Sequence, residues 1–545
     1  MTLADRVAQL IIMPCYGDSP GSETAEWKKF HRWVRELHVG GLIVLNRSEN
    51  GLVRNAQPFE MAVFLNRMQK LARIPLLVGG DFERGASMRV ADFPAFPFSM
   101  AFAAAGDPEA ARFEGAETAR EARALGVQWV FAPDADVNNN PDNPVIGTRS
   151  YSEDPQVAAE YVAAFIGGAH SDPANPVLVT AKHFPGHGDT AEDSHEGLAH
   201  LTADRERIER LELVPFRSAI AHQVDAVMTA HIAVPALDPT GVPATISRPI
   251  LTGVLRDELH FNGITVTDAM DMKGLSAGYS AGEAAVRSLE AGADVLLMPT
   301  DPDAVIRAVL AAIRSGRITR RRLDESVTKV LSAKARLRLN VSRLVDVESI
   351  GDALERREAV TRAQQIANRA VTLVRDDQHL VPLANPEKSC WLVVVEDRYS
   401  QLGRVLIREA LHRAPALTLN RFDPGMPASQ LDQAAKDTAS CDAVVAAVFA
   451  SGEPEGNLPG FLDEVIAGAR PVTLVALGNP YLLRRFPQVA AYLATFSTTP
   501  TSERAAVKAL FGEIPIGGHL PVTIPGFAKF GDGLERHSLN GKSTQ

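Results

Sequence analysis

The stretch V-L-V-T-A-K-H-F-P-G-H-G-D-T-A-E-D-S-H, from Val177 to His195, decides how this chain folds. Its first five residues are apolar or β-branched, which is typical of a strand that is buried on both faces. The run stops abruptly at Lys182 and continues with histidines, glycines and aspartates. In α/β barrels the catalytic side chains stand at the C-terminal ends of such strands. The stretch therefore predicts a buried strand with an active site at its end.

Similar short apolar runs recur along the first part of the chain, each preceded by a helix-like amphipathic segment and each ending in polar residues. Continuous apolar strands that alternate with helices predict a parallel sheet covered on both faces. Seven such units in about 300 residues favour a TIM-like (β/α) barrel over a doubly wound sheet. The runs are Gly41–Asn46, Pro75–Asp81, Trp129–Asp134, Val177–His183, Ala226–His231, Ile264–Asp268 and Ala293–Pro299.

A chain of 545 residues is longer than one hydrophobic core usually supports, so at least two domains are expected. A helix at about Thr319–Leu339 would close the barrel, which we place at residues 1–340. A linker follows at 341–369, and a smaller C-terminal α/β sandwich domain at 370–545. Few ionisable groups converge at the strand ends of this second domain, so we expect it to be mainly structural, with Glu453 and Glu455 as weaker functional candidates.

Composition narrows the range of partners. The formal net charge is −10, which argues against nucleic acid or an anionic membrane as the main partner, because both favour clustered Lys and Arg. We expect the basic run at 317–322 to be a solvated helix start. The oligomeric state stays open.

The cysteines and the N-terminus bear on the compartment. Cys15, Cys390 and Cys441 are far apart and odd in number, so neither a disulfide framework nor a cysteine metal site is expected, and a reducing compartment fits. Residues 1–14 lack the pattern of a signal peptide. If Met1 is the natural start, the protein is expected in the cytoplasm; a trimmed secreted form would have the same sequence.

Barrel geometry brings together the ionisable residues at the strand ends. Among them Asp268 directly follows the strand-like residues 264–267 and could attack an anomeric carbon to form a covalent glycosyl-enzyme. Aspartate also begins helices as an N-cap, so the residue alone leaves both interpretations open. The strand-end candidates are Asp81, Asp134, Lys182, His183, His231 and Asp268.

The loop after Lys182 adds a proton-transfer unit. Asp193 precedes His195 by two residues, and a carboxylate that accepts the imidazole N–H fixes its tautomer and raises its basicity. Gly186 and Gly188 would give the loop a mobile backbone. The pattern D-x-H is short and common, and taken alone it favours a solvated loop histidine with Asp193 as a turn residue.

Three segments together resemble the family 3 glycoside hydrolases of the β-N-acetylglucosaminidase type. They are K-H-F-P-G-H-G…D-S-H at 182–195, N-P-V-I-G-T-R-S at 143–150 and T-D-A-M-D-M at 267–272. The resemblance begins at residues 3–10, covers the whole barrel, and continues at 370–375 and 517–522 of the second domain. The first of these signatures is long and highly specific.

The resemblance implies a retaining exo-glycosidase that removes terminal β-linked N-acetylglucosamine without metal or cofactor. Asp268 would be the nucleophile, and Asp193 with His195 the acid/base dyad. The substrates implied are small carbohydrates, namely N-acetylglucosaminides, cell-wall fragments of peptidoglycan recycling among them. The residues implied to hold the sugar hydroxyls and the N-acetyl group are Asp81, Arg149, Lys182 and His183.

Several alternatives remain open at this stage. A neutral imidazole repels an anionic acceptor less than a carboxylate would, so phosphorolysis with phosphate as acceptor is a variant, as is a β-glucosidase of the same family. Arg84 stands where many relatives carry glycine and leaves the choice among peptidoglycan, chitin and glycoconjugate fragments undecided. A non-catalytic sugar-binding protein would be expected to lack the nucleophile or the dyad.

A metal-dependent barrel hydrolase is a remote alternative, because imidazole and carboxylate groups bind zinc. The H-x-H pattern expected at its first strand is absent from Leu42–Asn46. The ligands of such a site would come from His183, His187, Asp189, Asp193, His195 and His231.

Overall fold

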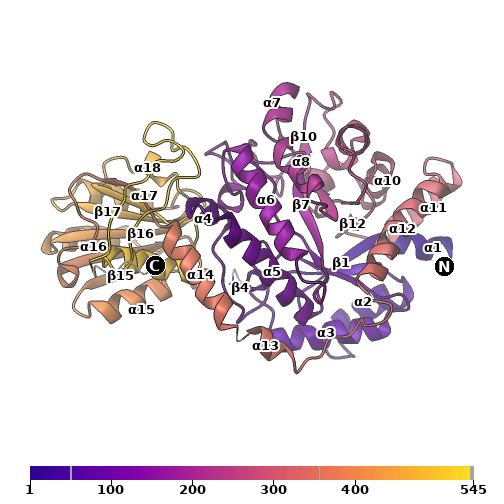
Figure 1. Cartoon of the computed structure of the whole chain (residues 1–545), viewed down its shortest axis with the longest axis horizontal. Helices are drawn as coiled ribbons and strands as arrows, with labels where there is room; N and C mark the ends of the chain where they lie inside the picture. Colours follow the sequence, from indigo (N-terminus) through magenta and orange to yellow (C-terminus); the bar gives the residue numbers. More distant parts are fainter. Residues whose placement is uncertain (50–51, 355, 540–545) are drawn as a thin grey trace.

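The chain forms two α/β bodies, a barrel built by the N-terminal part and a sheet domain built by the C-terminal part (Figure 1). The computed structural model describes residues 1–49, 52–354 and 356–539. Residue 355 of the predicted linker and residues 540–545 of the predicted second domain lie outside this description. The predicted fold class is confirmed.

Eight parallel strands build the barrel. A parallel bridge between Val266 and Val295 connects the two ends of the strand order given next, and so closes the barrel. In spatial order the strands are β11 (Ile264–Val266), β9 (Ala226–Thr229), β7 (Leu178–Phe184), β6 (Trp129–Val130), β5 (Leu77–Gly80), β2 (Gly41–Val44), β1 (Ile11–Cys15) and β12 (Leu296–Leu297).

The strand β1 was not among the seven predicted runs. It carries Pro14, and proline argues against a central strand because it cannot donate a ladder hydrogen bond. Its pairing with both β12 and β2 nevertheless places it inside the barrel wall.

Helices surround the strands and bury their apolar faces in one core. The predicted closing helix is observed as α12 (Arg320–Arg336), and the Thr319 hydroxyl caps its first turn. The other helices of this part are α1 (Leu3–Ala8), α2 (Ala25–His31), α3 (Pro58–Leu71), α4 (Ser99–Ala104), α5 (Pro108–Leu125), α6 (Pro155–Ala169), α7 (Arg205–Arg210), α8 (Leu213–Ala221), α9 (Lys273–Ser276), α10 (Ala281–Ala291) and α11 (Pro302–Arg314). Short pairs are formed by β3 (Arg47–Glu49) with β4 (Leu52–Arg54) and by β8 (Ala199–His200) with β10 (Ile232–Ala233).

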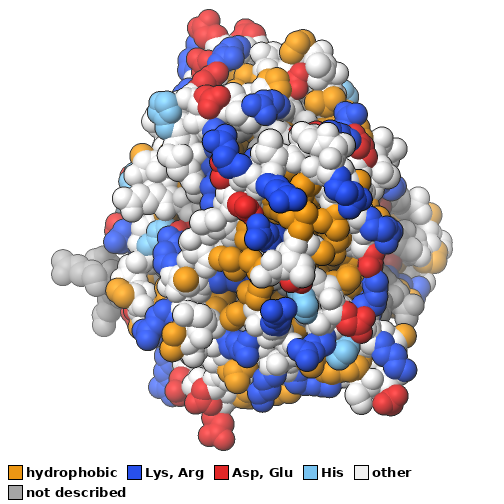
Figure 2. All heavy atoms as spheres, turned by 90° about the vertical axis from the view of Figure 1, so that its right-hand side faces the viewer, with side chains coloured by type: hydrophobic (Ala, Val, Ile, Leu, Met, Phe, Trp, Pro, Cys, Tyr) orange, Lys and Arg blue, Asp and Glu red, His pale blue; other side chains and the backbone are white. Residues whose placement is uncertain are grey.

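The barrel face seen in Figure 2 shows Lys and Arg side chains interspersed with acidic and apolar ones. Within the predicted basic run, Arg317 pairs with Glu283 and with Glu290, the latter at 2.9 Å. Arg322 reaches the buried carboxylate of Asp294 at 3.3 Å. Much of the charge of the run is therefore compensated within the barrel.

The second domain is a six-stranded sheet with helices on both faces and a separate core on each face. Every neighbouring pair is parallel except the edge pair of β13 and β18. The strand order is β13 (Thr372–Asp376), β18 (Ala491–Ala494), β17 (Val472–Gly478), β16 (Ala443–Ala450), β14 (Ser389–Val395) and β15 (Thr418–Phe422). The helices are α15 (Arg404–Arg413), α16 (Ala428–Asp437), α17 (Leu458–Ala467), α18 (Leu482–Arg485) and α19 (Pro500–Leu510).

The segment between the two bodies is largely helical, with α13 (Ile350–Leu354) and α14 (Arg357–Ala370). Helix α14 packs against α4 and α5 of the barrel and against α19 of the second domain. Helix α4 itself contributes Met100, Ala101 and Ala104 to a core of the second domain. The two bodies are thus joined through shared packing, and the predicted boundaries at 340/341 and 369/370 stay predictions.

The prediction that the cysteines stay unpaired was wrong. Cys390 and Cys441 form a disulfide, with their Cα atoms 5.8 Å apart. The two residues are 51 positions apart in sequence, but the parallel pairing of β14 with β16 brings them side by side. Cys15 is a buried free thiol, and burial raises its pKa to about 12.

Within residues 1–49, 52–354 and 356–539, no helix has the length and apolar character needed to span a bilayer.

Candidate active site

A pocket of about 440 Å³ opens at the C-terminal ends of the barrel strands. Six of the seven predicted site residues line it, and the seventh, Asp193, reaches it through its hydrogen bond to His195. The ionisable and polar side chains around the pocket are Asp81, Glu83, Arg89, Arg149, Lys182, His183, His187, Ser194, His195, Asp268 and Asp271.

One side of the pocket is a dense ionic network. Lys182 reaches Glu83 at 2.5 Å and Asp81 at 3.0 Å. Arg149 binds both carboxylate oxygens of Glu83, at 2.9 and 3.0 Å, and lies 3.1 Å from Asp134. Such paired, fixed charges can hold sugar hydroxyls in defined directions.

The network shifts the pKa values of its members in opposite directions. Burial alone would raise the pKa of Glu83, but Arg149 and Lys182 hold it well below its ordinary value. Burial likewise works against the charge of Lys182, yet Asp81 and Glu83 raise the pKa of this ammonium group. For Asp134 burial prevails over the attraction of Arg149 and raises the pKa to about 7.

Asp136 organises His183, near the end of β7, and His187, which follows the strand. Its Oδ2 is 2.8 Å from His183 Nδ1, and its Oδ1 accepts the backbone N–H of His187 at 2.7 Å. Burial opposes the charge of His183, but Asp136 raises the pKa of this imidazole. Burial lowers the pKa of His187 to about 4, so that ring is neutral at pH 7.

The β7 loop, residues 185–198, carries the predicted dyad. His195 Nδ1 lies 2.8 Å from Asp193 Oδ1, and the imidazole side chain is 60% exposed. Burial would raise the pKa of Asp193, but the hydrogen bonds from His195 lower it. With Nδ1–H donated to the carboxylate, the other ring nitrogen is free to exchange a proton with a ligand in the pocket.

Gly186 and Gly188 of this loop are required by close packing. A Cβ at Gly188 would lie 1.9 Å from the carbonyl oxygen of Val137, and one at Gly186 would lie 2.8 Å from the Glu212 side chain. The loop is further fixed by a 2.9 Å contact between His187 Nε2 and Ser194 Oγ. The predicted mobility of this backbone stays a prediction.

Asp268 stands two residues after β11, next to the segment on which the β7 loop rests. It does not cap the following helix: α9 begins at Lys273, and the residue before it is Met272. Its Oδ1 accepts the N–H of Ala269 at 2.7 Å, and no other hydrogen bond to this carboxylate occurs among the residues of known placement. The alternative of a helix N-cap is thereby removed.

Gly274 joins the nucleophile candidate's segment to the β7 loop. Its N–H donates to the carbonyl oxygen of Ser194 at 3.1 Å. A Cβ here would lie 2.9, 3.0 and 3.1 Å from the carbonyl oxygens of Ser194, Gly197 and His231. The two segments can approach this closely because residue 274 has no side chain.

Several candidate ligands of the metal-dependent alternative are already bound to other groups of the protein. His187 binds Thr190 and Ser194, His231 binds Thr245 and the carbonyl of Ala269, and Asp189 pairs with Arg207. A different group, Asp134, Asp136 and His183, has ligand-type atoms within 4.8 Å of one another. Lys182 and Arg149 already place two cations beside Asp134, so a divalent ion there would meet like charge.

Sequence reasoning gave no role to Glu83, Arg89 or Asp136. Glu83 lies two residues beyond the predicted Asp81, and Asp136 two residues beyond Asp134. Both are buried acids that orient predicted residues. The sequence did contain a signal for these two acids, namely the patterns D-x-E at 81–83 and D-x-D at 134–136, each at the end of a predicted strand.

A larger cleft of about 850 Å³ lies between the two domains and shares Glu83 and Arg149 with the pocket. Arg84 lines this cleft rather than the pocket and lies 4.9 Å from the ring of Phe98. Burial lowers the pKa of Arg84 to about 10, so it remains charged at pH 7. The weaker candidates Glu453 and Glu455 line the opposite wall, which belongs to the second domain.

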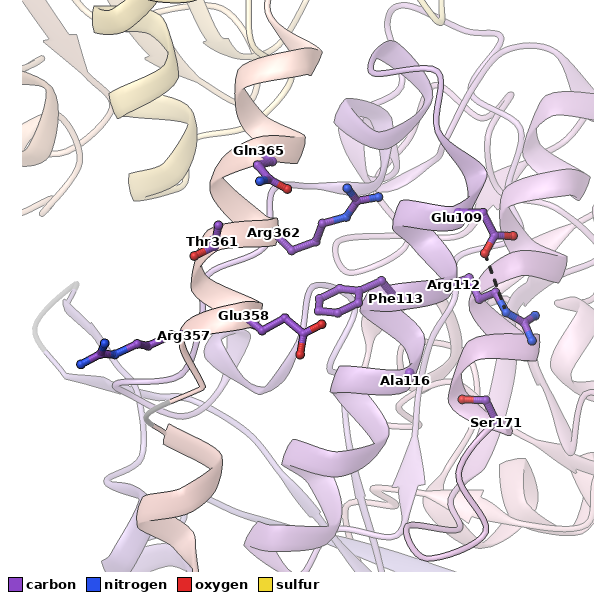
Figure 3. A pocket seen from close by; sticks show the side chains of 10 residues that line it. All are labelled: Glu109, Arg112, Phe113, Ala116, Ser171, Arg357, Glu358, Thr361, Arg362 and Gln365. Atoms are coloured by element: carbon purple, nitrogen blue, oxygen red, sulfur yellow. Dashed lines mark ion pairs between the residues drawn. The ribbon is translucent and has the colours of Figure 1, made fainter. Parts of the chain in front are cut away.

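Another hollow, of about 680 Å³, lies between α5 and α14 on the outside of the barrel (Figure 3). Phe113 and Arg362 face it from the two helices. No residue from the C-terminal end of a barrel strand lines it, so it is separate from the candidate active site.

The fold and the site together define a barrel enzyme with a pocket for a small polar ligand. Residues 2–333 match the model of the glycosyl hydrolase family 3 N-terminal domain. The chain therefore belongs to glycosyl hydrolase family 3 and is a glycoside hydrolase.

Relatives match nearly the whole chain. A β-N-acetylglucosaminidase/β-glucosidase of Cellulomonas fimi is 30% identical over 521 residues, which cover 90% of this chain and 89% of the relative. The structure of a family 3 β-N-acetylglucosaminidase from Paenibacillus sp. str. FPU-7 has a TM-score of 0.85 at 32% identity and covers 96% of this chain and 99% of its own. The β-glucoside phosphorylase BglX shares the fold, with a TM-score of 0.82 at 24% identity and coverages of 96% and 94%.

Proposed function

We propose that this chain is a retaining exo-β-N-acetylglucosaminidase that uses Asp268 as nucleophile and the Asp193–His195 dyad as acid and base. The observation that carries the proposal is the single pocket that Asp268, His195 and the ionic network line together. The names of the full-length Cellulomonas and Paenibacillus relatives support the choice of sugar. The sugar-holding roles of Asp81, Arg149, Lys182 and His183 belong to the same proposal.

In the first step the free Asp268 oxygen attacks the anomeric carbon and the bond to the leaving oxygen breaks. His195, carrying a proton on each ring nitrogen, gives its Nε2 proton to that oxygen and becomes neutral, while Asp193 keeps the bond to Nδ1–H. In the second step His195 takes a proton from water, the water oxygen attacks the anomeric carbon, and Asp268 leaves as carboxylate. The configuration at that carbon is inverted twice and so retained.

The test is release of p-nitrophenol from its β-N-acetylglucosaminide. We expect Asp268→Asn to abolish it and a 2-fluoro sugar inactivator to label Asp268. Asp271 is the competing carboxylate, since it lies in the same pocket and burial raises its pKa. A label on Asp271, or full activity in Asp268→Asn, would overturn the assignment of the nucleophile.

Phosphate is a second candidate acceptor. The acid/base position is an exposed imidazole instead of a second carboxylate, so an anionic acceptor meets less repulsion there. Rates and products measured with and without phosphate, on N-acetylglucosaminides and glucosides side by side, decide the matter. A sugar 1-phosphate product would establish phosphorolysis, and unchanged rates with free sugar as the product would establish hydrolysis.

A further inference from the structure

The loop between β6 and α6, residues 131–154 and here called the β6 loop, carries three groups of the candidate site. Asp134, Asp136 and Arg149 all belong to it, and regular structure in it is limited to a single helical turn at Gly147–Arg149. A long loop of this kind is usually mobile unless something external ties it down. The second domain supplies such ties.

Several interdomain contacts hold the β6 loop. Asn138 Nδ2 donates to the hydroxyl of Tyr481 at 2.9 Å, and both residues are buried. Ser152 Oγ donates to the carbonyl of Pro521 at 2.7 Å. The Glu153 carboxylate accepts both the N–H and the hydroxyl of Thr523, each at 2.6 Å.

These anchors connect directly to Arg149. The hydroxyl of Ser150, the next residue, donates to the carbonyl of Asp136 at 2.7 Å and accepts the N–H of Asn138 at 3.2 Å. Asn138, held by Tyr481, is therefore bonded to the residue beside Arg149. A shift of Asn138 would be transmitted to the guanidinium that binds Glu83.

The β6 loop also supports the β7 loop. Asn143 Nδ2 donates to the carbonyl oxygens of His187 and Thr190, at 2.8 and 2.9 Å. Next to Asn143, Asp142 pairs with Arg484 of the second domain at 2.7 Å. A continuous series of contacts thus leads from the second domain to the loop that carries Asp193 and His195.

We propose that the C-terminal domain is a positioning scaffold for the active site, acting through the β6 loop on Arg149 and on the β7 loop. This inference rests on the proposed function, because it assigns Arg149 to the sugar and His195 to proton transfer. It gives the second domain a role in catalysis without placing any of its residues against the reacting atoms. Tyr481 and Thr523 are then positioning residues.

The experiment compares two threonine-to-valine changes at the domain boundary, one that removes a contact with the β6 loop and one that removes a contact elsewhere. Thr523→Val removes the hydroxyl that binds Glu153 of the β6 loop. Thr501→Val is the matched control, since its hydroxyl also crosses the domain boundary but binds the carbonyl of Ala95 instead, at 3.1 Å. Tyr481→Phe is a second test variant that removes only the hydroxyl bound to Asn138.

We expect kcat/KM for the p-nitrophenyl N-acetylglucosaminide to fall about fivefold to tenfold in Tyr481→Phe, because small displacements of catalytic groups cost large factors in rate. Thr523→Val should lose about threefold and Thr501→Val less than about twofold, with similar unfolding temperatures in all three. KM should rise in Tyr481→Phe and Thr523→Val, because a displaced Arg149 would hold the sugar less well. The fall in kcat should be larger for a methyl glycoside than for p-nitrophenyl, because the poorer leaving group depends on the β7 loop for its proton.

Equal kinetics in Thr523→Val and Thr501→Val, together with unchanged kinetics in Tyr481→Phe, would overturn the positioning role. Loss of activity that is equal for both leaving groups and unaccompanied by a change in KM would also overturn it. If the wild-type protein releases no p-nitrophenol at all, the proposed function fails instead. The two failures are therefore distinguishable in one set of measurements.

Discussion

The buried carboxyl group of Glu121 predicts how strongly the stability of the protein depends on pH. This residue of α5 is fully buried; its Oε2 accepts the N–H of Ala86 at 2.8 Å, while its Oε1 has no partner within the described chain. Burial raises the pKa of Glu121 from 4.5 to about 8, although the bond from Ala86 works in the opposite direction. The folded protein therefore holds a proton on Glu121 at pH 7.

Because the folded-state pKa is the higher one, the stabilising contribution is complete below pH 4.5 and is lost as the pH rises towards 8. Between pH 4.5 and 7 the span of about 2.5 units corresponds to about 3 kcal/mol of unfolding free energy at 1.36 kcal/mol per unit. Glu121→Gln keeps an acceptor oxygen for Ala86 and carries no titrating group. The Glu121→Gln variant should therefore not lose this unfolding free energy as the pH rises.

The assay is the unfolding temperature by calorimetry at pH 4.5, 6, 7 and 8. The difference between Glu121→Gln and wild type should grow steadily across this range. Glu109→Gln is the matched control on the same helix, with a side chain that is 79% exposed, and it should follow wild type at every pH. A difference between Glu121→Gln and wild type that stays constant with pH would refute the reasoning.

Three further changes test other parts of the molecule. Glu83→Gln removes the carboxylate shared by Arg149 and Lys182 and should raise KM for the N-acetylglucosaminide about tenfold in steady-state kinetics; an unchanged KM would contradict the holding role. Ser194→Ala removes the contact with His187 inside the β7 loop and should lower kcat more for methyl than for p-nitrophenyl glycosides, and equal losses would count against this role. Cys390→Ser opens a crosslink between residues 51 apart and should cost about 4 kcal/mol of unfolding free energy with KM unchanged; no drop in the calorimetric unfolding temperature would show the crosslink to be dispensable.

The barrel could be predicted because its strands are buried on both faces and read as continuous apolar runs. Strand β7 is the clearest instance, with all seven residues buried. The strand β15 is hard to predict from the sequence, because Thr418–Phe422 lies at the edge of its sheet and is partly exposed, so its pattern is too weak to separate from a loop. The disulfide was missed because sequence distance says nothing about which strands pair.

For the site, barrel geometry predicts the residues at strand ends, whereas the loop residues Arg149, Asp193 and His195 could be predicted only from short motifs and a family resemblance. Lys182 lies in the C-terminal part of β7 and Asp268 two residues beyond β11, so barrel geometry alone brings them to one pocket. The positions of Glu83 and Asp136 depend on how each loop turns after its strand. The support from Tyr481 depends on contacts between domains, for which the sequence carries no local signal.

The close approach at Gly274 bears on protein engineering. The backbone there is enclosed by carbonyl oxygens from the β7 loop and from the strand end at His231, so each surface is shaped to the other. A β7 loop grafted from a relative would meet a docking surface made for a different loop. Chimaeras that aim at new leaving-group preferences should therefore exchange residues 185–198 and 268–276 as a single block.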